Sequence, residues 1–330
     1  MLNAAFLLAL ADYPRLYDDE ARSRIREHAV IVGDPVPSLE WTKHRETLAQ
    51  TDVIFSGWGA PLLDEALLEA SPRLKAVFYA GGSVRYCLTD AFWRRGIRVT
   101  SANLMNAIPV SEYTASAILL GLKRFWHYAQ QTRVEHRFQN SGAVTGSYRT
   151  TVGLISYGSI ARLVRKRLSN SDLKIIVYDP FLSDEQAKRE EVQLVTLDEL
   201  FSLSDAVSLH APLRKETTGL IRGHHFERMK PGTIFINTAR GEIVNESEMI
   251  SCLSRRMDLQ AILDVTAPEP PEPGSALYSL PNVVLTPHIA GSLGNECRRL
   301  GHSMADEFVR FIRGEPLQWE LSAEKVAVMA

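Results

Sequence analysis

Short apolar runs alternate with charged amphipathic stretches over the first hundred residues. The runs have the length of buried strands, and stretches such as 14–28 and 62–70 have helical spacing, which predicts a parallel sheet with helices on both faces. The apolar segment 3–11 is interpreted as a buried first strand and not as a leader peptide, because no positive charge precedes it and acidic residues follow closely. The other strands predicted in this half are residues 29–33, 52–55, 74–78 and 97–101.

The pattern changes near residue 107. Residues 107–131 form a nearly unbroken run of helix formers, and Pro109 is placed in the opening turn of this predicted helix, where proline is tolerated. The aromatic residues Phe125, Trp126 and Tyr128 near its end favour packing against a second subunit. A single core helix is the alternative interpretation.

A second alternation of strands and helices begins near residue 150. It contains six strand candidates, the number that a dinucleotide-binding sheet uses. A final helix is predicted over 294–313 and is expected to return to the first domain, whereas the residues beyond Pro316 carry no clear signal. The six strand candidates are residues 152–155, 174–178, 206–209, 233–237, 260–263 and 283–286.

Length and composition narrow the class of protein. The chain has 330 residues, beyond the ~250–300 at which a single hydrophobic core stops growing, so two domains are expected. A net charge of −2 without a basic tract argues against a nucleic-acid or anionic-membrane surface. No apolar run approaches the ~18 residues of a membrane span. The three cysteines contain no CxxC pair, which argues against a disulfide framework or a zinc site and favours a reducing, cytoplasmic compartment.

The segment 152–161 matches the dinucleotide fingerprint GxGxxG/A at Ser156, Gly158 and Ala161. The pattern requires a tight turn, then a bare backbone beside the pyrophosphate, then a small residue for helix–strand packing. Ser156 departs at the first position, and a glycine that ends a strand is by itself common turn chemistry. Asp179 follows 21 residues beyond Gly158 at the end of the next strand. A carboxylate there accepts ribose hydroxyls and repels a 2′-phosphate, which favours NAD over NADP, although Asp179 before a proline is also a turn starter.

Three later segments, 237–241, 264–270 and 286–291, each follow a predicted strand and carry a chemically able residue. Because ligands bind beyond the carboxyl ends of parallel strands, these residues are expected to converge. His288 suits a proton donor to a nascent alkoxide, and Glu269 suits a partner that orients it and favours its cationic form. Arg240 suits a bidentate grip on the carboxylate of a 2-oxo acid. Each residue alone has an ordinary structural explanation, and their joint placement is what indicates a site.

These segments resemble the D-isomer-specific 2-hydroxyacid dehydrogenases. The resemblance rests on residues 209–213, 216–220, 229–233, 237–244 and 280–291. It implies an α/β fold of two Rossmann-like, doubly wound parallel-sheet domains. Residues 1–103 plus 293–330 would form a flavodoxin-like substrate domain, split by an NAD-binding Rossmann domain at 104–292.

The resemblance also implies roles for individual residues. Arg240 would bind substrate and polarise its carbonyl, His288 would be the acid/base, and Glu269 its partner. The backbone N–H groups of Gly81, Gly82 and Ser83 would hold the substrate carboxylate together with Arg240. Contacts with NAD would come from Tyr157, Gly158, Ser159, Ile160, Asp179, His210, Ala211, Pro212, Thr217, Thr238, Ala239, Arg240, Asp264, His288 and Gly291.

The sequence therefore predicts an NAD-dependent oxidoreductase of small 2-hydroxy or 2-oxo acids such as glyoxylate or hydroxypyruvate, acting as a homodimer and without a metal. One alternative is an NAD-sensing, non-catalytic co-regulator on the same fold, and another is a formate or phosphite dehydrogenase. Three departures from the family pattern, Ser156, the run 82–85 and Thr266, leave cofactor affinity and substrate identity open. Trp58, Tyr79 and Arg85 are candidates for setting specificity.

Overall fold

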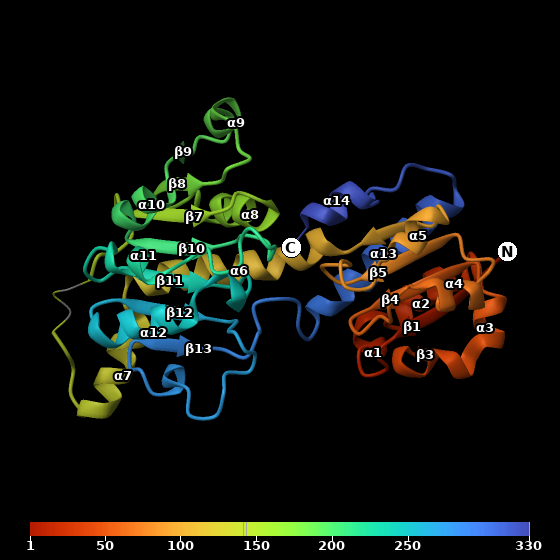
Figure 1. Ribbon diagram of the computed structural model, residues 1–330, viewed down its shortest axis with the longest axis horizontal. Coiled ribbons are helices and arrows are strands. Elements are labelled where there is room, and N and C mark those ends of the chain that lie inside the picture. Colours follow the sequence, from red (N-terminus) through yellow and green to blue (C-terminus); the bar gives the residue numbers. More distant parts are fainter. Residues whose placement is uncertain (141, 143, 330) are drawn as a thin grey trace. The chain divides into compact units, whose positions relative to one another are not determined.

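The computed structural model describes residues 1–140, 142 and 144–329. The chain divides into two compact units (Figure 1). Unit 1 comprises Met1–Ala107 and Ser292–Met329, and unit 2 comprises Ile108–Gly291. The sequence predicted divisions after residues 103 and 292, whereas the two compact units divide after residues 107 and 291. The first turn of helix α6 (Asn103–Leu122) therefore belongs to unit 1.

Unit 1 is built on a parallel sheet with the strand order β2-β1-β4-β5-β6, to which β3 adds a short pairing with β1. Leaving the two-residue β3 aside, this is the 2-1-3-4-5 order of flavodoxin-like folds, which confirms the predicted fold class. The strands are β1 (Leu2–Leu8), β2 (Ala29–Ile31), β3 (Val36–Pro37), β4 (Val53–Gly57), β5 (Ala76–Ala80) and β6 (Arg98–Ser101).

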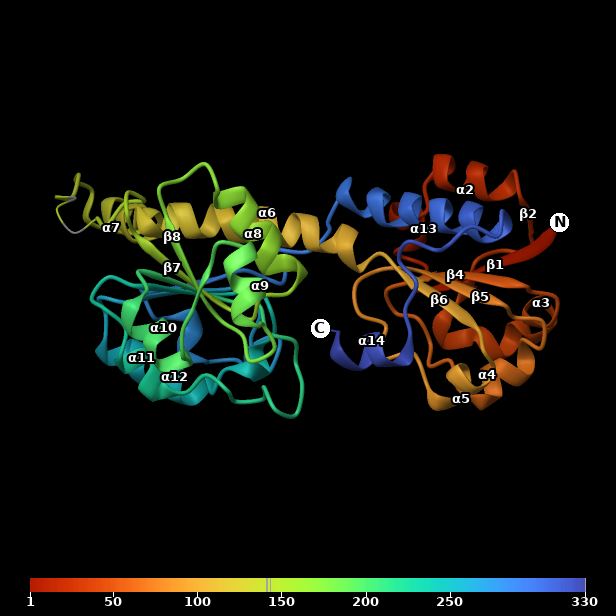
Figure 2. The same ribbon diagram turned by 90° about the horizontal axis from the view of Figure 1, so that it is seen from above.

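Helices cover both faces of this sheet, which explains why its strands are apolar throughout and do not alternate (Figure 2). Along β1, Phe6 packs toward α2 and α13, whereas its neighbour Leu7 packs toward α4 and α5. The helices are α1 (Tyr13–Leu16), α2 (Asp19–Arg26), η1 (Ser38–His44), α3 (Arg45–Ala49), α4 (Glu65–Ala70), α5 (Asp90–Arg94), α13 (Glu296–Ile312) and α14 (Ala323–Val328).

Helix α13 returns to unit 1, as the sequence predicted. Its apolar side packs Leu300, Met304 and Phe308 against the aromatic rings of β4 and β5. At Gly301 the helix passes so close to α1 that a Cβ atom would lie 1.7 Å from the Leu16 carbonyl oxygen. A glycine is therefore required at this position.

Unit 2 contains a seven-stranded parallel sheet in the order β13-β12-β11-β10-β7-β8-β9. This is the six-stranded Rossmann order, β9 to β12, extended by β13 beside β12. It has one strand more than the six predicted, because β9 contributes only two residues and gave no signal in the sequence. The strands are β7 (Thr151–Ile155), β8 (Lys174–Tyr178), β9 (Gln193–Leu194), β10 (Ala206–Leu209), β11 (Ile234–Asn237), β12 (Gln260–Leu263) and β13 (Val283–Leu285).

Two layers of helices bury this second sheet. Helices α6 and α8 lie on one face, and α10, α11 and α12 lie on the other (Figure 2). The helices of unit 2 are α6 (Asn103–Leu122, which begins in unit 1), α7 (Phe125–Glu135), α8 (Ser159–Leu168), α9 (Asp184–Arg189), α10 (Leu197–Leu203), α11 (Gly223–Glu227), η2 (Gly241–Ile243), α12 (Glu246–Arg255) and η3 (Ala276–Tyr278). In the described part of the chain, no helix combines the length and apolar character that a bilayer span requires.

The single helix predicted over 107–131 is wrong in two respects. The segment forms two helices, α6 and α7, because Arg124 between them adopts a left-handed backbone conformation (φ 52°) that interrupts the helix. The first helix also starts earlier, at Asn103, whose N–H donates to the Ser101 hydroxyl. Pro109 therefore lies inside α6 and not in its opening turn, so the Met105 carbonyl lacks the usual helical donor.

The residues beyond Pro316, which gave no signal in the sequence, have a defined place on unit 1. Glu320 forms an isolated antiparallel bridge with Thr100 at the edge strand β6. Its carboxylate also accepts two hydrogen bonds from Arg98, at 2.6 and 2.9 Å. The tail therefore covers the open edge of the sheet before α14 begins.

Candidate functional site at the carboxyl ends of the unit 2 strands

The turn that joins β7 to α8 has the geometry of a phosphate-binding loop. Ser156 has φ 70°, a left-handed conformation that favours glycine and that explains why the fingerprint has glycine at this position. Gly158 is the N-cap of α8, and a Cβ atom built there would meet nothing within 4 Å. Among the described residues, no side chain caps this ten-residue helix. No cap side chain therefore occupies the N–H groups at the start of the helix, which leaves them available to a pyrophosphate.

Asp179 lies at the end of β8, beside that turn. One carboxylate oxygen accepts the Tyr157 N–H at 2.7 Å and, more weakly, the Ser156 hydroxyl at 3.4 Å. The other oxygen accepts the Phe181 N–H at 2.8 Å. Asp179 therefore ties the phosphate-binding turn to the end of the next strand and retains acceptor capacity for ribose hydroxyls, since each carboxylate oxygen has two lone pairs.

The loop after β10 contains His210, which is buried, and burial lowers its pKa to about 3. Its Nε2 atom is buried without a hydrogen-bond partner among the described residues. Thr217, predicted to contact cofactor, uses its hydroxyl within this loop: it donates to the Pro212 carbonyl at 2.6 Å and accepts the Arg214 N–H at 2.8 Å. The side chain of Thr217 therefore shapes the loop.

The segment after β11 positions Arg240. Asn237 braces the turn from both sides, since its amide donates to the Arg240 carbonyl and its oxygen accepts the Ala239 N–H, each at 3.0 Å. The Arg240 guanidinium donates to the Ala239 carbonyl at 2.6 Å and is half-buried. Thr238 is buried, and its hydroxyl lies 3.0 Å from that of Thr114 on α6. The side chain of Arg240 thus extends from a turn whose backbone is held by hydrogen bonds.

Asp264 fixes the loop that carries His288. Its side chain is buried and accepts the N–H groups of Ile289 and Ala290 at 2.9 and 2.8 Å and the Thr286 hydroxyl at 2.5 Å. The Asp264 carbonyl accepts the His288 N–H at 3.0 Å. These bonds hold His288 in a left-handed conformation (φ 55°) that a non-glycine residue adopts only when its surroundings impose it.

Glu269 and His288 meet across these two loops. The Oε1 atom of Glu269 lies 2.6 Å from Nδ1 of His288, and both side chains are partly open to solvent. An ionised carboxylate only accepts, so Nδ1 carries the proton in this contact and Nε2 is left to exchange a proton with a ligand. Among the predicted site residues, the structure thus brings together Asp264, Glu269 and His288, and it places Arg240 at the end of the strand adjacent to β12.

In unit 1, the segment Gly81–Ser83 follows β5. The Gly81 N–H donates to the Tyr79 carbonyl at 2.9 Å, so it is already engaged within the loop. The Ser101 hydroxyl donates to the Gly82 carbonyl at 2.6 Å, which turns that carbonyl inward. Tyr79 is fully buried and bonds to the Tyr86 hydroxyl at 2.8 Å. Within the predicted trio of N–H groups, those of Gly82 and Ser83 are therefore the better suited to hold an anion.

A cluster of Asp198, His224 and His225 on unit 2 has side-chain atoms close enough to surround a metal ion. However, the Nδ1 atom of His225 accepts the Arg222 N–H at 2.9 Å. Burial lowers the pKa of His225 to about 4, so the neutral ring carries its proton on Nε2. That nitrogen has no lone pair for an ion, and the cluster does not suit a metal.

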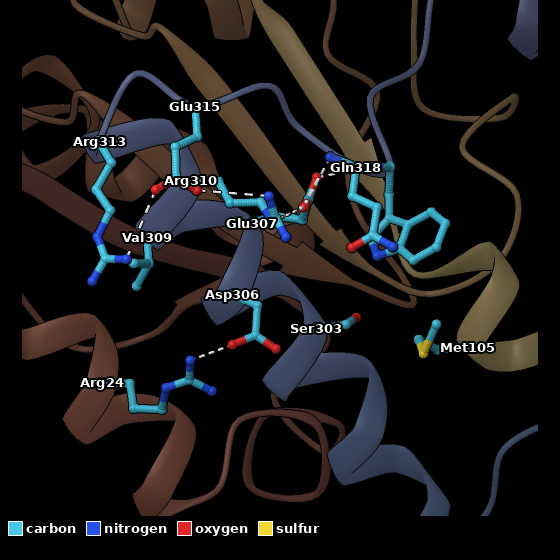
Figure 3. Close-up of a pocket in the computed structure, with 11 residues that line it drawn as sticks. Arg24, Met105, Ser303, Asp306, Glu307, Val309, Arg310, Arg313, Glu315 and Gln318 are labelled. Atoms are coloured by element: carbon cyan, nitrogen blue, oxygen red, sulfur yellow. Dashed lines mark hydrogen bonds and ion pairs between the residues drawn. The ribbon is translucent and has the colours of Figure 1, made fainter.

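A cavity of about 430 Å³ in unit 1 lies along α13 (Figure 3). Its charged walls are internally paired. Arg24 bonds to Asp306, Arg310 lies 3.7 Å from Glu307, and Arg313 lies 3.8 Å from Glu315. The cavity therefore presents no excess of either charge to a ligand.

Residues that hold Arg240 in place were not predicted from the sequence. Asn237 and Gly241 flank Arg240 in the motif 237–241, and a Cβ atom on Gly241 would lie 2.0 Å from the Thr266 carbonyl carbon. The glycine beside Arg240 was the available signal, because it marks a close approach of backbones. The bracing by Asn237 had no signal beyond its place in the motif.

Comparison with known proteins gives the context of this site. The model of the D-isomer specific 2-hydroxyacid dehydrogenase NAD-binding domain matches residues 116–290. The D-3-phosphoglycerate dehydrogenase of Archaeoglobus fulgidus is 35% identical over 257 residues, which cover 78% of this chain and 49% of that protein. The human D-3-phosphoglycerate dehydrogenase is 30% identical over 259 residues, with 78% and 48% covered. The chain thus spans about half the length of these relatives.

Solved structures share the fold. The D-isomer specific 2-hydroxyacid dehydrogenase of Lactobacillus delbrueckii ssp. bulgaricus, solved in complex with NAD, is similar with a TM-score of 0.80 at 21% identity, over 97% of this chain and 99% of that one. The family model covers more than half of this chain and includes Arg240, Glu269 and His288. We conclude that the chain belongs to the D-isomer specific 2-hydroxyacid dehydrogenase family and that unit 2 carries the family's NAD-binding domain.

Proposed function

We propose that this protein transfers hydride between NAD(H) and a small 2-hydroxy or 2-oxo acid, such as glyoxylate or hydroxypyruvate. The observation that carries the proposal is the His288–Glu269 pair, whose atoms lie 2.6 Å apart at the carboxyl ends of the strands. It lies in the unit that also presents the open N-terminus of α8 and the Asp179 carboxylate. A hydrogen-bonded histidine and carboxylate serve a reaction that moves a proton as well as a hydride.

Bound NAD supplies the hydride acceptor, and NADH the donor. In the reductive direction His288 gives its Nε2 proton to the carbonyl oxygen as the hydride reaches the carbonyl carbon, so that an alcohol forms. Glu269 holds the ring by Nδ1 and stabilises its cationic form before the proton leaves. Arg240 binds the substrate carboxylate and polarises the adjacent carbonyl through its planar donors.

Two further parts of the proposal concern ligand binding. The N–H groups of Gly82 and Ser83 in unit 1 would contribute to holding the substrate carboxylate, as a nest of backbone donors does. Asp179 would accept the ribose hydroxyls and disfavour a 2′-phosphate, which gives a preference for NAD over NADP. Comparing the Kd of NADH and NADPH tests the second point directly, and Asp179→Ala is expected to reduce the difference.

The test of the activity is NADH oxidation followed at 340 nm with a panel of 2-oxo acids. Glyoxylate, hydroxypyruvate, pyruvate and phenylpyruvate are the first members, and D-3-phosphoglycerate with NAD⁺ is added because of the curated relatives. With the best substrate, His288→Ala is expected to lower kcat by at least ~100-fold, within the range of general acid–base catalysis. Full activity of that variant would refute the acid/base role.

The same panel, extended by NAD⁺ with formate, phosphite and 2-hydroxy acids, separates the alternative functions. Tight NADH binding without turnover of any 2-oxo acid would favour an NAD-sensing binding protein. Reduction of NAD⁺ by formate or phosphite, but not by 2-hydroxy acids, would favour a dehydrogenase of those anions. The Glu269–His288 contact supports a carbonyl substrate, because hydride transfer to a carbonyl leaves an alkoxide that needs a proton.

We also propose a homodimer that uses α7. None of the side chains of this helix is buried, and Phe125 and Val134 are more than half exposed. Only Trp126 of this helix packs against the unit 2 core among the described contacts, so α7 gains little stability from its own unit and a second copy is a suitable cover. Light scattering after size exclusion tests this state, and Val134→Glu is expected to shift it toward monomer. A cytoplasmic location stays a prediction from the cysteine pattern.

A further inference from the structure

The loop that carries Glu269, residues 264–275, contains four prolines and lies partly in solvent, yet the Glu269 carboxylate meets His288 at hydrogen-bond distance. Something must therefore hold the loop against the body of unit 2. Within the loop, the Thr266 hydroxyl donates to the Pro268 carbonyl at 2.8 Å. That bond shapes the loop but does not attach it to another element.

The Tyr278 hydroxyl of η3 holds the far side of the loop by donating to the Pro271 carbonyl at 3.3 Å. The side nearer β12 is attached to the first turn of α12. The Glu246 carboxylate accepts the Ala267 N–H at 3.0 Å, two residues before Glu269. Glu246 is the first residue of α12 and lies six residues after Arg240, so one short segment carries both the proposed substrate arginine and the anchor of the Glu269 loop. The intervening η2 packs at Gly241 directly against the Thr266 backbone. The steric contact at Gly241 and the hydrogen bond from Ala267 to Glu246 therefore both join the segment of Arg240 to that of Glu269.

The Glu246 side chain is itself half-buried, and burial raises its pKa, while the Ala267 N–H partly offsets that rise. A carboxylate kept in such surroundings suits a bond to a backbone donor, because the helix N-terminus and the N–H group both stabilise its charge. A glutamine in its place retains an acceptor oxygen at the same reach. An alanine removes this hydrogen bond and leaves the Ala267 N–H without its acceptor.

We propose that Glu246 is a positioning residue: by holding the Ala267 N–H it fixes where the Glu269 carboxylate meets His288. This inference rests on the proposed function for its effect on catalysis, but the positioning itself is independent of turnover. Misplacement of a catalytic partner by about 1 Å can cost ~100-fold in rate. Glu246→Ala is therefore expected to lower kcat by ~10–100-fold with little change in the KM of NADH, and Glu246→Gln to stay within a few-fold of wild type.

Glu248 provides a matched control. It lies in the same first turn of α12 and also accepts a backbone N–H, but that of Gly223 at 2.6 Å, on a segment away from Glu269. Glu248→Ala thus removes an acid from the same helix end and a comparable hydrogen bond. It is expected to leave kcat unchanged even where it lowers stability.

The deciding experiment records the NMR signals of the His288 ring and the exchange of the Ala267 amide in the full-length variants. Glu246→Ala is expected to move the ring signals toward their positions in Glu269→Gln and to speed Ala267 exchange, while Glu248→Ala does neither. Where Glu246→Ala does not fold, Glu246→Asp serves, since it keeps the charge and shortens the reach by one methylene. Ring signals at their wild-type positions in these variants, or equal changes in Glu248→Ala, would overturn the proposal. Absence of turnover in the wild type would instead refute the proposed function, and the ring signals would still decide the role of Glu246.

Discussion

Replacing Ser156 by glycine tests whether the departure from the dinucleotide fingerprint has an energetic consequence. Ser156 has φ 70°, where the Cβ atom of an L-residue approaches its own backbone, at a cost of about 1–2 kcal/mol. Glycine removes that cost, but it also increases the conformational entropy of the unfolded chain, which lowers the free energy of unfolding by about 0.4–1 kcal/mol. The Ser156 hydroxyl lies 3.4 Å from the Asp179 carboxylate, near the limit of a hydrogen bond, so its loss costs little.

The net expectation is that Ser156→Gly raises the free energy of unfolding by about 0.5–1 kcal/mol. For a domain of roughly 150–250 residues this corresponds to a Tm increase of about 1–4 °C. Urea unfolding followed by tryptophan fluorescence measures the difference. Ser156→Ala is the control, since it removes the hydroxyl but keeps the Cβ atom. If the glycine variant were no more stable than the alanine variant, the strain assigned to Ser156 would be refuted.

Three other predictions follow from burial and close packing. Burial lowers the pKa of His210 to about 3 in the folded protein, whereas a histidine in the unfolded chain has a pKa of ~6.5. Between these two pH values the unfolded chain binds a proton that the folded chain does not. The folded protein therefore loses stability as the pH falls below about 6.5. His210→Gln is expected to reduce the dependence of the unfolding free energy on pH between pH 6 and 4 by up to ~1.4 kcal/mol per pH unit. The measurement is urea unfolding at several pH values, and the same pH dependence in both proteins would contradict the prediction. Gly301→Ala is expected to destabilise unit 1 by at least ~1–3 kcal/mol, because its methyl group would meet the α1 backbone, and an unchanged midpoint of thermal unfolding would show that the helices separate freely. Burial raises the pKa of Cys87 to about 12 and of Cys252 to about 11, so neither thiol is expected to react with Ellman's reagent at pH 8 until the chain unfolds.

The strands and the order of the chemistry-bearing segments were predictable because they depend on local patterns. Apolar runs such as 52–55 and 206–209 indicate strands buried on both faces, and the rule for parallel sheets then places Arg240, Glu269 and His288 at one edge. Local patterns do not report backbone geometry. The break at Arg124 depends on a left-handed residue whose type does not require it, so the helix over 107–131 was predicted as one.

Hydrogen bonds between residues far apart in the chain could not be predicted from the sequence either. The bond between Glu246 and Ala267 joins residues 21 apart, and that between Arg98 and Glu320 joins residues 222 apart. Neither residue type is unusual at its position on a helix or strand. Such bonds depend on which elements become neighbours after folding, which is why the anchors of the site and the place of the tail came from the structure.

The route of the chain has a consequence for synthesis on the ribosome. Unit 2 is one continuous stretch, Ile108–Gly291, and its sheet is complete once β13 has emerged. The core of unit 1 needs Leu300 and Phe308 from α13, which is translated nearly two hundred residues after β6. The strands of unit 1 are synthesised first, but their aromatic face stays uncovered until α13 has been translated. Unit 2 can fold during that interval. A nascent chain arrested before residue 292 should accordingly hold a protected unit 2 beside a protease-sensitive unit 1.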